Sequence, residues 1–202
     1  AGAQGARLTQ ELPVLTRAVL GDWQTEFNWD PRVKQTVIDW YASEAVNDLQ
    51  RNALLRLIQE GKYEKVKAGF DSPTGRIEPG TAGSRGEMED LEEGKVGPNY
   101  FSTTTVIQYG HDFARYYASV KPGATVFLAK EVREHSDLYN DILSKIYLSY
   151  GLKVVRVSFT VSTPIASFLP QWVTPQGSSI VGGDQVSASH NGWTNNGLKF
   201  MG

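Results

Sequence analysis

The spacing of hydrophobic residues changes near Gly61, and this change limits the folds open to the chain. Up to about residue 60 apolar residues recur every three to four positions, which is the period of amphipathic helices. Asp30-Pro31 is a typical helix start, so we expect helices from residue 31 and over residues 8–20 and 43–60. Beyond Gly61, short β-prone segments alternate with loops and two further helical patterns. This order predicts an α+β protein.

The helical segment and the β-prone segment divide the chain into two expected parts. Residues 1–61 are expected to form an N-terminal helical lobe and residues 62–202 a core of two small packed β-sheets. A long exposed loop with one short helix is expected at residues 71–99, which are rich in glycine, proline and acidic residues. The expected strands are residues 65–70, 100–103, 125–132, 153–161, 165–169, 180–181 and 185–189, with helices over 106–119 and 137–150.

Composition excludes several kinds of site. The chain has 202 residues and no cysteine, so disulfides, cysteine-ligated metals and a thiol nucleophile are excluded. A net charge of -2 gives no reason to expect a nucleic-acid partner, and no apolar run is long enough for a membrane span. The three histidines lack partners at metal-ligand spacing, so we expect no metal. Ala1–Gly5 lack an initiator Met and an apolar segment, which is typical of an excised domain of a larger polypeptide.

A run of hydroxyl residues lies where a short strand is expected to meet a helix. Tyr100-Phe101 is followed by Ser102, Thr103, Thr104 and Thr105, and the helical pattern begins directly after them. Hydroxyls at such a junction can contact a ligand, but Ser102 and Thr103 could equally cap the helix. A second segment, Gly183-Asp184-Gln185-Val186-Ser187-Ala188, forms the start of a late strand.

Together these two segments resemble the mono-ADP-ribosyltransferase toxins, the family of cholera and pertussis toxins. The first resembles the family's aromatic-Ser-Thr-Ser strand end. The second resembles the strand that carries its catalytic Glu, with Gln185 at the position of that Glu. The resemblance covers roughly residues 62–190 and implies an ADP-ribosyltransferase-type fold. Its family function would be NAD-dependent transfer of ADP-ribose to a target protein, inactive as given because Gln185 lacks the charge of Glu.

The resemblance also implies roles for individual residues. Gln185, Ser102 and Thr103 are the expected catalytic residues. Lys67, Arg76, Phe101, Ser102, Thr103 and Thr104 are expected to bind NAD, which would be a substrate. Trp172 and Gln176 would contact the target protein. Each residue also has a plain structural explanation: Lys67 and Gln185 as surface residues, and Trp172 as a packing residue.

Alternative functions remain open at this point. The same fold could be an NAD glycohydrolase, or a non-catalytic binding domain, or the helical lobe of an unrelated interaction domain could do the binding. The toxin resemblance implies secretion or delivery into a host or competitor cell. It also implies a protein acceptor there and a carrier or immunity protein as further partners.

Overall fold

The computed structural model describes residues 30–80, 83–173 and 180–201, and the chain divides into two compact units. The first unit extends to Arg76 and also includes Asp90–Asn99, and the second comprises Ile77–Glu89 and the residues from Tyr100 onward. The expected boundary after residue 61 therefore falls within the first unit. The helix expected over residues 8–20 lies outside the described residues. None of the described helices is long and apolar enough to cross a membrane.

The first unit is a small cluster of helices around its own core. These are α2 (Pro31–Ala42), α3 (Asp48–Gln59) and α4 (Tyr63–Phe70). Asp30 caps α2 by accepting the Arg32 N–H at 2.8 Å, as the sequence predicts. The expected start of the next helix at residue 43 is wrong, because a capping box at Asn47 begins α3 only at Asp48.

The strand expected over residues 65–70 is also wrong, because this segment is helix α4. Val66 and Phe70 are four residues apart and both fully buried in the core of the first unit, so the segment follows a helical period. Lys67, expected on a strand beside NAD, is an exposed residue of this helix.

The second unit is built on one five-stranded sheet with the strand order β1-β5-β4-β2-β3. Its strands are β1 (Ser84–Glu87), β2 (Thr125–Lys130), β3 (Lys153–Arg156), β4 (Ile180–Val186) and β5 (Asn195–Met201). Strands β2, β3 and β4 are parallel, whereas β5 runs antiparallel to its neighbours β4 and β1. The sheet is therefore mixed.

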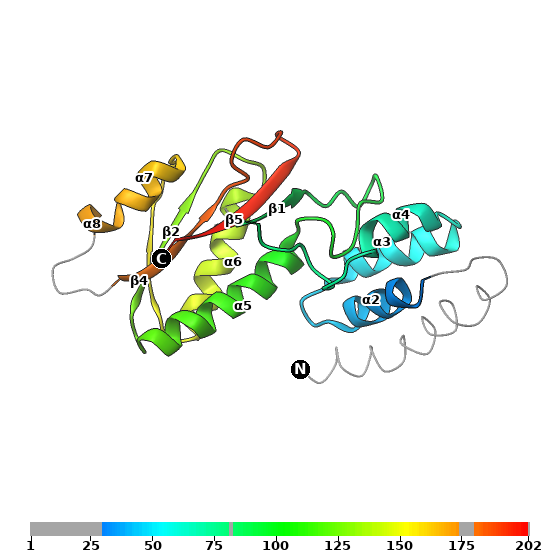
Figure 1. The fold of residues 1–202 in the computed structure, drawn as a ribbon, viewed down its shortest axis with the longest axis horizontal. Coiled ribbons are helices and arrows are strands. Elements are labelled where there is room, and N and C mark those ends of the chain that lie inside the picture. The colour runs from blue at the N-terminus through cyan, green and yellow to red at the C-terminus, as the bar shows by residue number, and fades with distance from the viewer. Residues whose placement is uncertain (1–29, 81–82, 174–179, 202) are drawn as a thin grey trace. The chain divides into compact units, whose positions relative to one another are not determined.

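Helices cover both faces of this sheet (Figure 1). On one face α5 (Thr103–Val120) and α6 (Ser136–Ser149) pack against Val126, Leu128, Val186 and Leu198. On the other face α7 (Thr163–Phe168), followed by the short α8 (Pro170–Val173), covers a smaller cluster that includes Phe127 and Ala129. Alternate residues of β2 thus serve two cores, which is the pattern of a strand buried on both faces. The result is an α/β/α arrangement.

The expected α+β fold with two packed sheets is therefore wrong. Strands β1 and β5 were missed because their sequences, SRGE and NNGLKFM, are rich in glycine, asparagine and charge. Residues 165–169, expected as a strand, lie largely in α7. The expected strands at 180–181 and 185–189 are one strand, β4, which continues through Gly182 and Gly183.

These two glycines let β4 pass close to its neighbours. A Cβ at Gly183 would lie 2.5 Å from the carbonyl oxygen of Phe127, and a Cβ at Gly182 would lie 2.6 Å from the Tyr117 ring. Both distances are too short for any side chain. Glycine is therefore required where β4 packs against β2 and α5.

A carboxyl group lies in the core between the sheet and α5 and α6. Asp184 of β4 is fully buried, and its Oδ2 accepts hydrogen bonds from the Tyr147 hydroxyl at 2.5 Å and the Tyr117 hydroxyl at 3.2 Å. Its Oδ1 has no hydrogen-bond partner within the described part of the chain. Burial raises the pKa of Asp184 to about 7, against the opposing effect of the two hydroxyl donors.

Candidate functional site

Polar side chains gather where the three parallel strands end. Glu131 directly follows β2, and Ser189 comes shortly after the end of β4. Thr163 is the first residue of α7, the helix that follows β3 in the sequence. In open sheets of this type, ligands bind outside the carboxyl ends of the parallel strands, where loops rather than paired backbone face the solvent. This edge of the sheet is therefore the candidate position of a functional site.

Ser189 lies in a tight turn with a strained backbone conformation. Its φ is 59°, and among the described non-glycine residues only His135 shares a positive φ. A residue with a side chain in this conformation is strained by roughly 1–2 kcal/mol. The Ser189 N–H donates to the Ser187 hydroxyl at 3.0 Å, which helps to hold the turn. The half-buried serine is thus presented at the strand end in a defined orientation.

Arg133 fixes this turn and the residues after it. Its guanidinium donates to the carbonyl oxygens of Ser189 at 2.8 Å, Asn191 at 3.0 Å, Gly192 at 2.9 Å and Asn195 at 2.8 Å. The side chain is only 9% exposed. Because one rigid planar group satisfies four carbonyls, the loop that joins β4 to β5 is held in a single shape.

Lys199 of β5 approaches the same edge from the face of the sheet that α7 covers. Its ammonium donates to the Thr163 hydroxyl at 2.5 Å, and that hydroxyl lies 3.5 Å from a carboxylate oxygen of Glu131. Glu131 in turn pairs with Arg133 at 3.6 Å. Burial lowers the pKa of Lys199; the charge of Glu131 opposes this effect, and Arg85 and Arg133 add to it. Three cations and one carboxylate therefore share this edge, which favours an anionic ligand.

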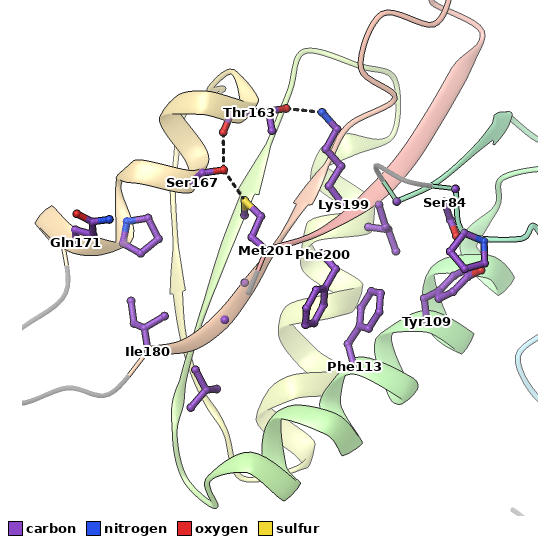
Figure 2. A pocket seen from close by; sticks show the side chains of 18 residues that line it. Ser84, Tyr109, Phe113, Thr163, Ser167, Gln171, Ile180, Lys199, Phe200 and Met201 are labelled. Carbon is purple, nitrogen blue, oxygen red and sulfur yellow. Dashed lines mark hydrogen bonds between the residues drawn. The ribbon is translucent and has the colours of Figure 1, made fainter.

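A cavity of about 950 Å³ begins at Lys199 and Thr163 and extends along the sheet (Figure 2). Its lining is mostly apolar, with Phe200, Met201 and Phe113 prominent in the close view. Its size is that of a small-molecule site. The lysine is thus open to a ligand although its side chain is mostly buried.

The predicted site residues do not gather at this cavity. Gln185 is fully buried, and its amide donates to the Val161 carbonyl at 2.9 Å on the α7 side of the sheet. Ser102 is the N-cap of α5, accepting the Thr105 N–H at 3.4 Å, and Thr103 begins that helix. Phe101 and Thr104 are buried, Phe101 in the core on the α5 and α6 face. The hydroxyl pair and the amide therefore lie on opposite faces of the sheet.

The other predicted site residues that the structure describes do not line the cavity either. Lys67 and Arg76 belong to the first compact unit, whereas Ser102 and Gln185 belong to the second. Trp172 on α8 is 74% exposed and does not line the cavity. Gln176 lies outside the described residues.

Comparison with known proteins identifies a different relationship. The family model for the phosphoglucomutase/phosphomannomutase α/β/α domain I matches residues 76–202, which is more than half of the chain. The chain belongs to the phosphoglucomutase/phosphomannomutase family. The mixed sheet with helices on both faces agrees with this domain type.

Individual relatives give the same result. A phosphoglucosamine mutase of Thermus thermophilus is 29% identical over 123 residues, covering 61% of this chain and 25% of the relative. A phosphomannomutase of Mycoplasma pneumoniae is 31% identical over 127 residues, covering 60% of this chain and 21% of the relative. A crystal structure described as a phosphomannomutase from Thermus thermophilus matches with a TM-score of 0.50 at 27% identity, covering 62% of this chain and 25% of that one. The chain thus spans about a quarter or less of the length of these phosphohexose mutases.

This membership overturns the toxin interpretation. The phosphoglucomutase/phosphomannomutase family consists of enzymes, so the expectation of an enzyme holds, but transfer of ADP-ribose is wrong and the glycohydrolase and silent-fold alternatives lose their support. Secretion or delivery into another cell is wrong as well, because the relatives are metabolic enzymes. The expected protein acceptor, carrier and immunity protein depended on that activity, and no observation bears on them.

The cofactor prediction is also wrong. Phosphohexose mutases use a phosphoserine and Mg²⁺, whereas NAD without a metal was expected. The described residues include no group of three His, Cys, Asp or Glu side chains that could hold an ion. The residues that the structure describes therefore do not supply a Mg²⁺ site by themselves.

The sequence contains one local signal for this site. Val186-Ser187-Ala188, which resembles a toxin strand, is followed directly by Ser189. An Asn-Gly turn follows at Asn191-Gly192 and marks a tight loop directly after a strand. Arg133 and Lys199 carried no such signal, because they reach the loop only through the fold.

Replacing Arg133 with methionine is expected to lower the free energy of unfolding by about 3 kcal/mol. The substitution keeps most of the apolar stem but removes a donor from four carbonyls, of which that of Gly192 retains the Asn195 N–H at 3.1 Å. The other three are only partly buried, so each loss costs about 1 kcal/mol, at the low end of the range for an unpaired acceptor. Denaturant unfolding measures this difference. Arg115→Met is the matched control, because Arg115 is 62% exposed and pairs with Asp112 on the surface of α5. Its effect should stay below about 0.5 kcal/mol. Equal effects of the two substitutions would contradict the role of Arg133.

Proposed function

We propose that this chain contributes the phosphoryl-carrying serine of a phosphohexose mutase, and that the serine is Ser189. The observation that carries the proposal is the Ser189 turn, a strained backbone at the end of a parallel strand that Arg133 holds through four carbonyls. Strain of this kind persists only where surrounding contacts enforce it, and it gathers at functional sites. The family supports the choice of a serine, because its enzymes use phosphoserine.

The charges around the serine suit a phosphoryl group. Lys199, Arg133 and Arg85 lie near enough to one another to influence the pKa of Lys199, with Glu131 as the opposing carboxylate. A phosphoserine carries about 1.5 to 2 negative charges near neutral pH. The excess of cations at the edge would stabilise this charge and the charge that develops during transfer.

The reaction is a transfer between two oxygens. A hydroxyl of the hexose phosphate attacks the phosphorus of phosphoserine, a new sugar O–P bond forms, and the serine O–P bond breaks. The hydroxyl proton passes to a base, and the serine oxygen takes up a proton. The product is a hexose bisphosphate, which returns its other phosphoryl group to Ser189 by the same step in reverse. Lys199 is the candidate base, because it opens onto the cavity and burial lowers its pKa.

Phosphoryl labelling tests this proposal. The protein is incubated with hexose bisphosphates labelled in the phosphoryl groups, because the bisphosphate is the species that donates a phosphoryl group to the free serine. Glucose, mannose and glucosamine bisphosphates are used in parallel because relatives are named for these sugars. Peptide mass spectrometry then locates the label. We expect phosphoserine at Ser189 with at least one sugar, and a label at another residue would overturn the proposal. The same result decides between the three sugars, since the sugar that labels fastest is the preferred one.

A further inference from the structure

A continuous polar chain joins the cavity to the serine loop. It runs from the Lys199 ammonium to the Thr163 hydroxyl, then to the Glu131 carboxylate, then to Arg133, which holds the loop. The groups come from three separate segments of the second unit: β5, α7, and the residues after β2. Lys199 and Arg133 are 8% and 9% exposed, respectively, so both ends of the chain are largely shielded from water.

The direction of the hydrogen bonds in this chain is determined by the groups themselves. An ammonium can only donate and a carboxylate can only accept. The Thr163 hydroxyl has one proton, which points toward Glu131, so a lone pair is left facing Lys199. Glu131 therefore orients the hydroxyl, and the hydroxyl in turn orients the ammonium.

Glu131 also lies between two cations. Its carboxylate faces Arg133 at 3.6 Å on one side and, through Thr163, Lys199 on the other. The other charged group that influences Lys199 is Arg85 of β1. Glu131 is thus the one carboxylate among the charged groups that act on Lys199, and removing its charge leaves three cations facing each other.

We infer that Glu131 and Thr163 are positioning residues that hold Lys199 in register with the Arg133-bound Ser189 loop, so that the cavity lysine and the phosphoryl-carrying serine act on the same bound sugar phosphate. This inference rests on the proposed function. Thr163 lines the cavity beside Lys199, and the inference gives it and Glu131 the task of orienting the lysine. Their effect reaches the reaction only through Lys199 and Arg133.

Thr163→Val tests the relay, because valine has the same shape but no hydroxyl. We expect kcat for transfer to fall by roughly tenfold, a part of the 10²–10⁴ that a positioned acid–base group supplies, while KM changes less than about threefold. Thr163→Ser retains the hydroxyl and should restore kcat to within about twofold. The matched control is Thr160→Val, an exposed threonine just before α7, which should leave both constants unchanged. A Thr163→Val enzyme with unaltered kcat overturns the inference.

Glu131→Gln separates charge from geometry, because the amide oxygen can still accept from Thr163. Loss of the carboxylate should lower the pKa of Lys199, as expected when a nearby opposite charge is removed. The limb of the pH–rate profile that reports Lys199 should move to lower pH. NMR titration of lysines labelled at the carbon next to the amine measures the pKa directly, with Thr160→Val again as reference.

The two proposals fail in distinguishable ways. If Ser189 acquires no phosphoryl group but Glu131→Gln still moves the Lys199 titration, the polar chain exists and the proposed function is wrong. If Ser189 is phosphorylated but the titration and kcat stay unchanged in both variants, the function stands and the positioning role is overturned. A fall in kcat that Thr163→Ser does not restore also overturns it, because that pattern indicates lost packing.

Discussion

Replacing Ser189 with alanine is expected to abolish phosphoryl transfer. The substitution removes the oxygen that carries the phosphoryl group. Removal of a covalent nucleophile commonly lowers kcat by about 10⁴-fold or more. The protein should also acquire no phosphoryl label when incubated with hexose bisphosphates. Both quantities are measured with the labelled sugars that test the proposed function.

The fold should survive this substitution. The residue 189 backbone keeps its N–H bond to Ser187 and its carbonyl bond to Arg133. The positive φ strains alanine about as much as serine, so it adds no further difference in stability. The unfolding free energy should therefore change by less than about 1 kcal/mol.

Ser102→Ala provides a control with the opposite pattern. Ser102 caps α5 and lies outside the cavity lining, so its loss should cost about 1 kcal/mol of stability and leave transfer unchanged. If Ser102→Ala abolished transfer while Ser189→Ala preserved it, the site would lie at the start of α5 and the assignment of Ser189 would be wrong.

The second large effect concerns the buried carboxyl of Asp184 and the pH dependence of stability. Burial raises the pKa of Asp184 to about 7 from the ordinary 3.8 of this side chain, so the folded protein binds a proton more tightly than the unfolded chain. The protonated group stabilises the fold fully below about pH 4, and this contribution is lost as the pH rises through about 7. Because one pKa unit corresponds to about 1.4 kcal/mol, the loss is on the order of 4 kcal/mol.

Asp184→Asn should remove this dependence, because an amide resembles the protonated acid and cannot ionise. We expect the unfolding free energy of the variant, relative to the unmodified protein, to increase by several kcal/mol between pH 4 and pH 8. Denaturant unfolding at a series of pH values measures the difference. Asp141→Asn on α6 is the control, since the Asp141 side chain is 50% exposed and should show no such trend. A constant difference between Asp184→Asn and the unmodified protein would show that the carboxyl does not titrate in this range.

Part of the fold could be predicted from the sequence because some segments carry their own signal. Helix α2 has an Asp-Pro start, α5 and α6 have apolar residues at helical spacing, and β2 is an uninterrupted apolar run. In each case the pattern is local, so reading a dozen residues suffices. Strand β5 has no such pattern, because it becomes a strand only when β4 and β1 bond to its two edges.

The site could not be predicted for a related reason. The run of four hydroxyl residues at 102–105 is conspicuous in the sequence, but in the fold it begins a helix and packs against the core. The proposed serine, Ser189, is one of many serines in the chain. What distinguishes it is Arg133, which is more than fifty residues away in sequence and donates to four carbonyls of its loop. Resemblance of short hydroxyl-rich segments is weak because such segments recur in unrelated proteins.

The sequence by itself determined the absence of thiol chemistry and the approximate positions of α2, α5, α6 and β2, because these depend on residue type and short spacing. The tertiary structure alone decided that β4 and β5 lie at the centre of one mixed sheet, and that Ser189, Arg133, Thr163, Glu131 and Lys199 meet at one edge. Long-range strand pairing brings these residues together, and no local pattern records which distant strand an edge will pair with.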